Sequence, residues 1–224
     1  AAPGEAADAV GHPAGQRLTR TAPSTPRTSP IPTQELRVSG NDQIVVTGIG
    51  MTTPLGADAP STWAGLLAGR TGGRRLEEPW AAELPVRIAA RVVVDPRDVL
   101  TVPERRRLDR SSQLALIAAR EAWEDAGRPE VPGERLGVVV ASGFGGVTTL
   151  LDSYDVLRER GPRRVLPTSV PMLMPNGPAG ALSIEFGAKA GAHTPVSACA
   201  SGAEAIGYGV EMIRNGRADV VIAG

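Results

Sequence analysis

The spacing of apolar residues changes several times along the chain, and each change predicts an element of secondary structure. From Asp109 or Ser111 to Ala126 the apolar side chains fall on one helical stripe, which Gly127 ends. Residues 136–141 and 219–223 are largely unbroken runs of aliphatic residues, typical of buried strands. The pattern therefore predicts helices that alternate with buried strands.

The same reasoning covers most of the remaining chain. We expect helices at residues 61–67, 147–160, 179–186 and 203–214, and further strands at residues 44–47 and 194–198. Residues 86–94 mix arginines into a β-branched run between two prolines, which suits an edge strand or an extended loop. Strands that alternate with helices imply an α/β fold with a largely parallel sheet.

Residues 1–40 differ in composition from the rest of the chain. They are rich in proline, alanine, threonine and arginine, and they contain no aromatic residue. Such a segment cannot bury enough apolar surface to offset its ordering entropy, so we expect a disordered tail ahead of an ordered domain at 41–224. A transit peptide is the alternative, although Glu5, Asp8 and Glu35 argue against it.

Composition and charge argue against several classes of protein. The 24 basic side chains balance the 24 acidic ones, whereas nucleic-acid binders and membrane-surface binders are normally strongly basic. No apolar run is long enough to cross a membrane, and we expect no signal peptide. The single cysteine cannot form an internal disulfide, which favours a reducing cytoplasm.

That cysteine, Cys199, lies where a predicted strand meets a predicted helix. Ser201 and Glu204 have the spacing of a capping box, so the helix should begin at or just after the cysteine. A thiol at a helix N-terminus faces unpaired backbone N–H groups and the positive end of the helix dipole, which favour the thiolate. The small residues around it predict a sharp strand-to-helix turn that presents a nucleophile. The alternative is a buried cysteine that acts as a small hydrophobic residue.

The segment Ser197-Ala-Cys-Ala-Ser-Gly202 resembles the active-site cysteine motif of the β-ketoacyl-acyl carrier protein synthases, or ketosynthases. Other segments match the family in the same order, and they lie at 44–56, 108–109, 143–146, 175–176 and 218–224. The glycine-rich segments do not complete the G-x-G-x-x-G spacing of a dinucleotide site. The chain is therefore similar to the N-terminal half of a synthase of the second subtype.

This resemblance implies a thiolase-like fold, in which two similar α/β halves stack in five αβαβα layers and two copies form a homodimer. It implies an acyltransferase of fatty acid biosynthesis, in which Cys199 takes an acyl group from the phosphopantetheine of acyl carrier protein. The backbone N–H of Cys199 would supply half of an oxyanion hole. Malonyl-acyl carrier protein then decarboxylates, and its enolate attacks the acyl thioester, which lengthens the chain by two carbons. No bound cofactor and no metal are expected.

The resemblance also implies that part of the catalytic machinery lies outside this chain. The family's two catalytic histidines, its buried lysine and its second glycine-rich loop belong to the half beyond Gly224. We therefore expect residues 41–224 to be a truncated domain that is inactive by itself and aggregates through unpaired apolar faces. A polyketide ketosynthase shares every motif quoted and is one alternative. A non-catalytic subunit of the chain-length-factor kind is the other, although that subunit lacks the nucleophilic cysteine and Cys199 therefore argues against it.

Two further groups of residues need an assignment. Extended chain would place His193 roughly 20 Å from Cys199, and His12 lies in the expected tail, so neither is a candidate base. Basic residues ahead of the long helix dock the acidic carrier protein in the family, which implies a partner-binding role for Arg106 and Arg107. A solvated arginine run that includes Arg105 is the alternative.

Overall fold

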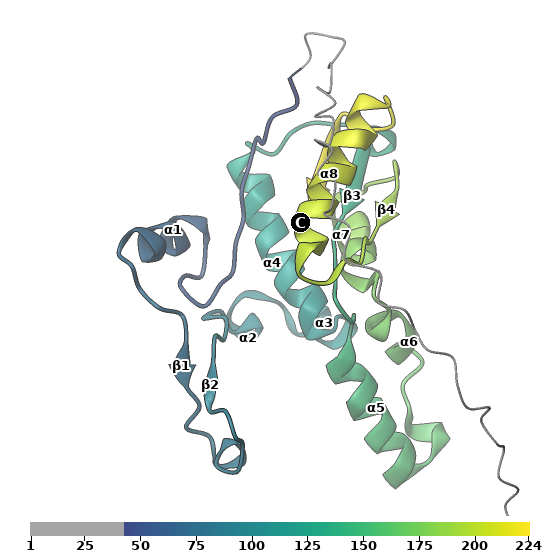
Figure 1. The fold of residues 1–224 in the computed structure, drawn as a ribbon. Helices are drawn as coiled ribbons and strands as arrows, with labels where there is room; N and C mark the ends of the chain where they lie inside the picture. The colour runs from purple at the N-terminus through teal and green to yellow at the C-terminus, as the bar shows by residue number, and fades with distance from the viewer. Residues whose placement is uncertain (1–42) are drawn as a thin grey trace, which may run out of the picture. The chain divides into compact units, whose positions relative to one another are not determined.

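The computed structural model describes residues 43–224, so the tail expected at residues 1–40 lies outside the described residues. At the centre of the described part is a parallel sheet of three strands in the order β4-β3-β5 (Figure 1). These strands are Leu136–Val139 (β3), Ala192–His193 (β4) and Val220–Ala223 (β5). All four residues of β3 are buried because parallel neighbours lie on both edges and helices cover both faces. The predicted parallel α/β sheet is confirmed.

The helices differ widely in length. The longer ones are α1 (Ala59–Leu67), α4 (Arg110–Asp125), α5 (Val147–Arg160), α7 (Gly177–Phe186) and α8 (Ser201–Arg214). Three short helices are α2 (Pro96–Val99), α3 (Val102–Arg107) and α6 (Ser169–Leu173). A two-stranded antiparallel hairpin pairs β1 (Arg74–Arg75) with β2 (Ile88–Ala89). None of the described helices has the length and apolar character needed to cross a membrane.

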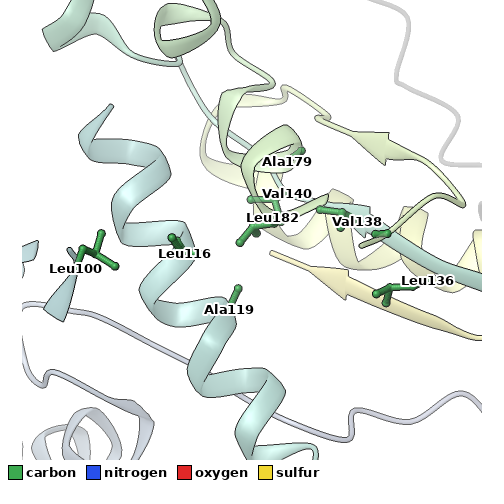
Figure 2. Close-up of a cluster of buried hydrophobic side chains, with 9 residues drawn as sticks. Leu100, Leu116, Ala119, Leu136, Val138, Val140, Ala179 and Leu182 are labelled. Carbon is green, nitrogen blue, oxygen red and sulfur yellow. The ribbon is translucent and has the colours of Figure 1, made fainter. Parts of the chain in front are cut away.

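The two faces of the sheet contact different helices because side chains alternate along β3. Leu136, Val138 and Val140 form one buried cluster with residues of α4 and α7, and Figure 2 shows Leu116 and Leu182 approaching them from these helices. Val139 lies in a second buried cluster with three residues contributed by α8 and the loop that follows it, Ala205, Met212 and Ala218. The sheet is therefore the middle of three layers, with α4 and α7 on one side and α8 on the other.

The strand predicted at residues 44–47 is absent, which corrects the sequence-based expectation. Residues 43–53 instead run along α4, where the backbone N–H of Ile49 donates to Asp125 (2.9 Å) and that of Met51 donates to Glu121 (2.8 Å). At Gly50 a Cβ atom would stand 1.9 Å from the carbonyl oxygen of Ala118, so only glycine permits this approach. Carboxylates of α4 thus satisfy two N–H groups just after the predicted strand and hold this segment along the helix.

The strand predicted at residues 194–198 is also wrong, since pairing ends at His193. The remaining elements follow the predictions closely: α5 has the predicted bounds, and α1, α4, α7 and α8 begin within two residues of them. The exposed segment at 86–94 contains β2, as an edge strand should. No residue of α5 is buried, and five of its large side chains are 45–58% exposed, namely Val147, Leu150, Leu151, Tyr154 and Leu157.

Candidate active site

Cys199 lies in a single turn of 3₁₀ helix, Ala198–Ala200, which leads directly into α8. Its side chain is exposed within the described part of the chain. The interpretation of Cys199 as a buried hydrophobic residue is therefore wrong. Helix α8 begins at Ser201, which confirms that the helix starts just after the cysteine. Cys199 therefore lies where the unpaired N–H groups of the first helical turn gather.

The turn that carries Cys199 is sharp and is held by one hydroxyl group. Ala198 has φ +53°, in the left-handed region that costs an L-residue about 1 kcal/mol. The Ser201 hydroxyl accepts a hydrogen bond from the Ser197 N–H (2.9 Å) and donates one to the Ala198 carbonyl (2.7 Å). Ser201 is only 5% exposed, so these two bonds form out of water. They close the chain around the cysteine and offset the strain at Ala198.

This role of Ser201 corrects the predicted capping box. Ala200, not Ser201, stands at the N-cap of α8, and no side chain caps the helix there. Because Ser201 is already the first helical residue, its hydroxyl turns back toward the preceding turn and cannot form the reciprocal pair with Glu204. Sequence reasoning recognised the serine but assigned it the wrong partner.

The backbone N–H of Cys199 has no hydrogen-bond acceptor among residues 43–224. It belongs to the first turn of a helical segment, where an N–H has no acceptor within the helix itself. The group beside the thiol is therefore free to donate to an oxygen atom of a bound molecule. A preorganised N–H next to a thiol is the arrangement that stabilises the oxyanion of an acyl transfer.

Only some of the small residues after Cys199 are needed for close packing. Ala205 is fully buried, and a Cβ atom on Gly209 would lie 3.2 Å from the side chain of Val221 in β5. Gly202 and Gly207 have no atom within 4 Å of such a Cβ in the described residues. Close backbone packing in this stretch is therefore confined to the side of α8 that faces the sheet.

His193 is engaged with α8 and with the loop after it. Its ring lies 5.0 Å from that of Tyr208, and its Nε2 is 3.3 Å from Nη2 of Arg217. Burial, and then the nearby positive charge of Arg217, lower the pKa of His193. His193 therefore packs against Tyr208 and Arg217, while His12 lies outside the described residues.

The three consecutive arginines are not equivalent in the structure. Arg106 and Arg107 are exposed, and neither forms an ion pair with another residue in the described range. Arg105 is partly buried, and its Nε is shielded from solvent without a hydrogen-bond partner there. Two charges of the predicted docking segment are therefore available to an acidic partner, whereas the third is turned toward the protein.

Asp109 connects the start of α4 to the start of α5, a role that sequence reasoning missed. One carboxylate oxygen accepts from the N–H and hydroxyl of Ser111 (both 3.0 Å), and the other accepts from the N–H (3.2 Å) and hydroxyl (2.7 Å) of Thr149. Asp109 is 5% exposed. A Cβ atom at Gly146 would lie 2.9 Å from its carboxyl carbon, so the glycine-rich turn at 143–146 packs directly on this residue.

An open hollow of about 640 Å³ lies along the β1–β2 hairpin. Cys199 is not among its lining residues, which are mostly charged and include Arg74, Glu78 and Arg91. An acyl chain requires apolar walls, so this hollow is a poor candidate for a substrate pocket. Between residues 43 and 224, no three His, Cys, Asp or Glu side chains gather in an arrangement that could hold a metal.

Comparison with known proteins accounts for this combination of features. The family model described as "Beta-ketoacyl synthase, N-terminal domain" matches residues 41–224, which include Cys199, Asp109 and both exposed arginines. The chain belongs to the β-ketoacyl synthase family. The expected resemblance is confirmed, and with it the thiolase-like fold of this ketosynthase domain.

Individual relatives agree with the family assignment. The ketosynthase domain is 45% identical over 183 residues to 3-oxoacyl-[acyl-carrier-protein] synthase 2 of Mycobacterium leprae (strain TN), which covers 81% of this chain and 44% of the relative. A crystal structure of a β-ketoacyl synthase from Burkholderia phymatum STM815 superposes with a TM-score of 0.65 at 31% identity, covering 78% of this chain and 44% of that one. The ishigamide ketosynthase/chain length factor gives a TM-score of 0.69 at 27% identity, covering 80% and 46%. The chain thus spans about half the length of the relatives it matches.

Proposed function

We propose that this ketosynthase domain carries the acyl-accepting cysteine of an enzyme that elongates fatty acids. In the first step the Cys199 thiolate attacks the carbonyl carbon of an acyl thioester on acyl carrier protein. The tetrahedral intermediate collapses with loss of the phosphopantetheine thiolate, and the acyl group remains on Sγ. The N–H of Cys199 would donate to the oxyanion that forms in this step.

In the second step the bond between the carboxylate and the α-carbon of malonyl-acyl carrier protein breaks and releases CO₂. The electron pair left on the α-carbon attacks the acyl thioester at Cys199, a carbon–carbon bond forms, and the cysteine thiolate leaves. The product is a β-ketoacyl-acyl carrier protein longer by two carbons. The chemistry needs no oxidant, no metal and no cofactor besides the phosphopantetheine arm that carries both substrates.

The observation that carries this proposal is the exposed Cys199 on a strained turn at the start of α8, beside an N–H group without an acceptor. A cysteine kept only for packing would be buried. A chain-length factor would lack the cysteine altogether. The names of the curated relatives, which are synthases acting with an acyl carrier protein, support the same assignment.

The partners and location belong to the same proposal. Arg106 and Arg107 would meet the acidic surface of acyl carrier protein, since both are exposed and have no ion-pair partner among the described residues. A homodimer in the cytoplasm is the assembly that we expect from the family resemblance and the single reduced cysteine.

The test is transfer of an acyl group to the full-length protein from octanoyl-acyl carrier protein, followed by intact-mass spectrometry and peptide mapping. We expect one octanoyl group on Cys199, and none on Cys199→Ala or on protein first treated with iodoacetamide. Cys199→Ser is the matched variant, because it keeps the size of the side chain and loses most of its nucleophilicity. Acylation of the alanine variant, or none of the wild type, would overturn the proposal.

A condensation assay with malonyl-acyl carrier protein separates the two pathways left open by the sequence. A fatty acid synthase should condense saturated acyl groups with malonyl-acyl carrier protein and release a single two-carbon extension. A polyketide ketosynthase would instead accept β-ketoacyl groups repeatedly and release chains extended several times. The length and oxidation state of the products therefore decide between the two activities.

A further inference from the structure

Helix α3, which displays Arg106 and Arg107, has no buried residue. A helix of six residues does not form by itself in water, so contacts with the rest of the fold must hold it. Leu100 before it and Leu108 after it belong to the core cluster. These two leucines anchor the ends of the segment but leave open its rotation about the line that joins them, and this rotation decides where the two arginines point.

Polar contacts with α4, which lies next to α3 in Figure 1, set that rotation. Glu104 lies on α3, and its Oε2 accepts hydrogen bonds from the N–H and hydroxyl of Thr101 (both 2.7 Å). Its Oε1 is 2.5 Å from Nη2 of Arg120 on α4. Hydrogen bonds from Thr101 and then from Arg120 lower the pKa of Glu104 to about 2, so this carboxylate stays charged at neutral pH. Gln113 donates to the carbonyls of Arg105 (3.1 Å) and Leu108 (2.8 Å) at the other end of α3.

Arg120 is itself held by a second carboxylate. Its Nη2 is 2.6 Å from Glu185 Oε1 on α7, and its Nε donates to the same oxygen at 2.7 Å. The side chains of Arg120, Glu104 and Glu185 are 36%, 24% and 34% exposed, so solvent screens them less than a fully exposed pair. One guanidinium group therefore connects three helices, and α3 is the only one of them without buried residues of its own.

The contact between Glu104 and Arg120 decides in which direction the other side chains of α3 point. Successive residues of a helix are rotated by about 100°. With Glu104 directed at Arg120, Arg106 lies about 200° away and Arg107 about 300° away. Arg106 therefore faces away from α4, whereas Arg107, at about 300°, is only about 60° from Glu104 on its other side. The exposed Arg106 fits this orientation, and Arg107 is also exposed, at the C-terminal end of α3.

We propose that Arg120 is a positioning residue for the acyl carrier protein: by holding Glu104 it fixes the rotation of α3 and so presents Arg106 and Arg107 to the acidic partner. Its guanidinium group also neutralises carboxylates that would repel such a partner beside the docking arginines. The inference rests on the proposed function, because it takes the carrier protein as the partner that α3 meets.

The test compares two substrates on the full-length enzyme. Octanoyl-acyl carrier protein must dock, whereas octanoyl-pantetheine reaches Cys199 without a carrier. In Arg120→Met we expect KM for the carrier substrate to rise about five-fold, the scale of displaced interface charges, with kcat nearly unchanged and transfer from octanoyl-pantetheine unaffected. Arg120→Lys, which keeps a charge but cannot bridge both carboxylates in the same geometry, should recover part of the loss.

The matched control is Arg128→Met. Arg128 also pairs with a glutamate of α4, Glu124 at 2.6 Å, but it contacts no residue of α3, so its loss should leave both KM values unchanged. If Arg120→Met folds poorly, Glu104→Gln keeps the side-chain shape and removes the charge, and it should raise KM for the carrier in the same way. An unchanged KM in both variants, or an equal loss with both substrates, overturns the inference. Failure of the wild type to accept either substrate overturns the proposed function instead.

Discussion

Replacing Asp109 by alanine tests how the start of the long helix is tied to the glycine-rich turn. The carboxylate accepts four hydrogen bonds, two from Ser111 and two from Thr149, while only 5% exposed. Alanine would leave the N–H groups of both residues without these acceptors and would open a cavity beside Gly146. The two helices would then lose their shared attachment at the point where they approach each other.

The magnitude follows from the bonds that are lost. Removing an aspartate N-cap costs about 1 kcal/mol, and hydrogen bonds to a charged acceptor contribute about 1.5 to 3 kcal/mol each. Because the Thr149 hydroxyl can turn to another acceptor, we count the N-cap and one such bond to Thr149. The sum is about 3 kcal/mol, which at about 2 °C per kcal/mol lowers Tm by about 6 °C.

The assay is thermal unfolding of the full-length protein by scanning fluorimetry, with Asp95→Ala as control. Asp95 also caps a helix by accepting from the N–H of Arg97 at 2.9 Å, but it is more exposed and reaches no second helix. We expect a much smaller change in Tm for the control. Equal shifts in the two variants would refute the reasoning, because they would mean that the bonds to Thr149 add nothing beyond ordinary capping.

Two further predictions concern the packing of the first described segment and the titration of His193. Gly50→Ala should destabilise the protein by about 1 to 3 kcal/mol, since its Cβ would stand 1.9 Å from the Ala118 carbonyl oxygen. A Tm within about 1 °C of the wild-type value would contradict the described path of the segment. Burial and Arg217 lower the pKa of His193 from its ordinary 6.5, so folding favours the neutral imidazole. The resulting contribution to the free energy of unfolding is complete above pH 6.5, and it is lost as the pH falls through the lowered pKa of the folded state. His193→Gln should therefore show a shallower loss of Tm on acidification, and an identical pH profile would argue against it.

Much of the fold could be predicted because local signals and tertiary contacts agree in it. Helix α5 was predicted with its correct bounds because Gly146 precedes its first residue and Gly161, at φ +79°, follows its last. Strand β3 was predictable from its apolar run, which a buried parallel strand requires. The three short helices were missed, since four to six residues give too few turns for a periodic pattern. In α2 and α3, prolines at the first positions also resemble loop signals.

The errors arise where distant groups decide the conformation. Residues 44–47 have strand composition, yet their neighbours bind carboxylates of α4 that are distant in sequence. Met51 and Glu121 are separated by 70 residues, and Ile49 and Asp125 by 76. Nothing in the local pattern indicates that pairing. In the site, Cys199 and its exposed position followed from the motif, but the distinction between Arg105 and its two neighbours depends on how α3 packs against the rest of the fold, which only the structure contains.

The order of strands in the sheet has a consequence for synthesis on the ribosome. The pair Arg135 and Asp219, which lies at the start of the β3–β5 ladder, is separated by 84 residues. At about 5 to 20 residues per second, translation needs about 4 to 17 seconds to add that length. During this interval the central strand has no neighbour on one edge, while helices that are local in sequence can form in microseconds. The nascent chain thus passes through a stage in which α4 and α7 shield one face of β3 and the opposite face is bare, and a chaperone that binds exposed strands would act in this interval.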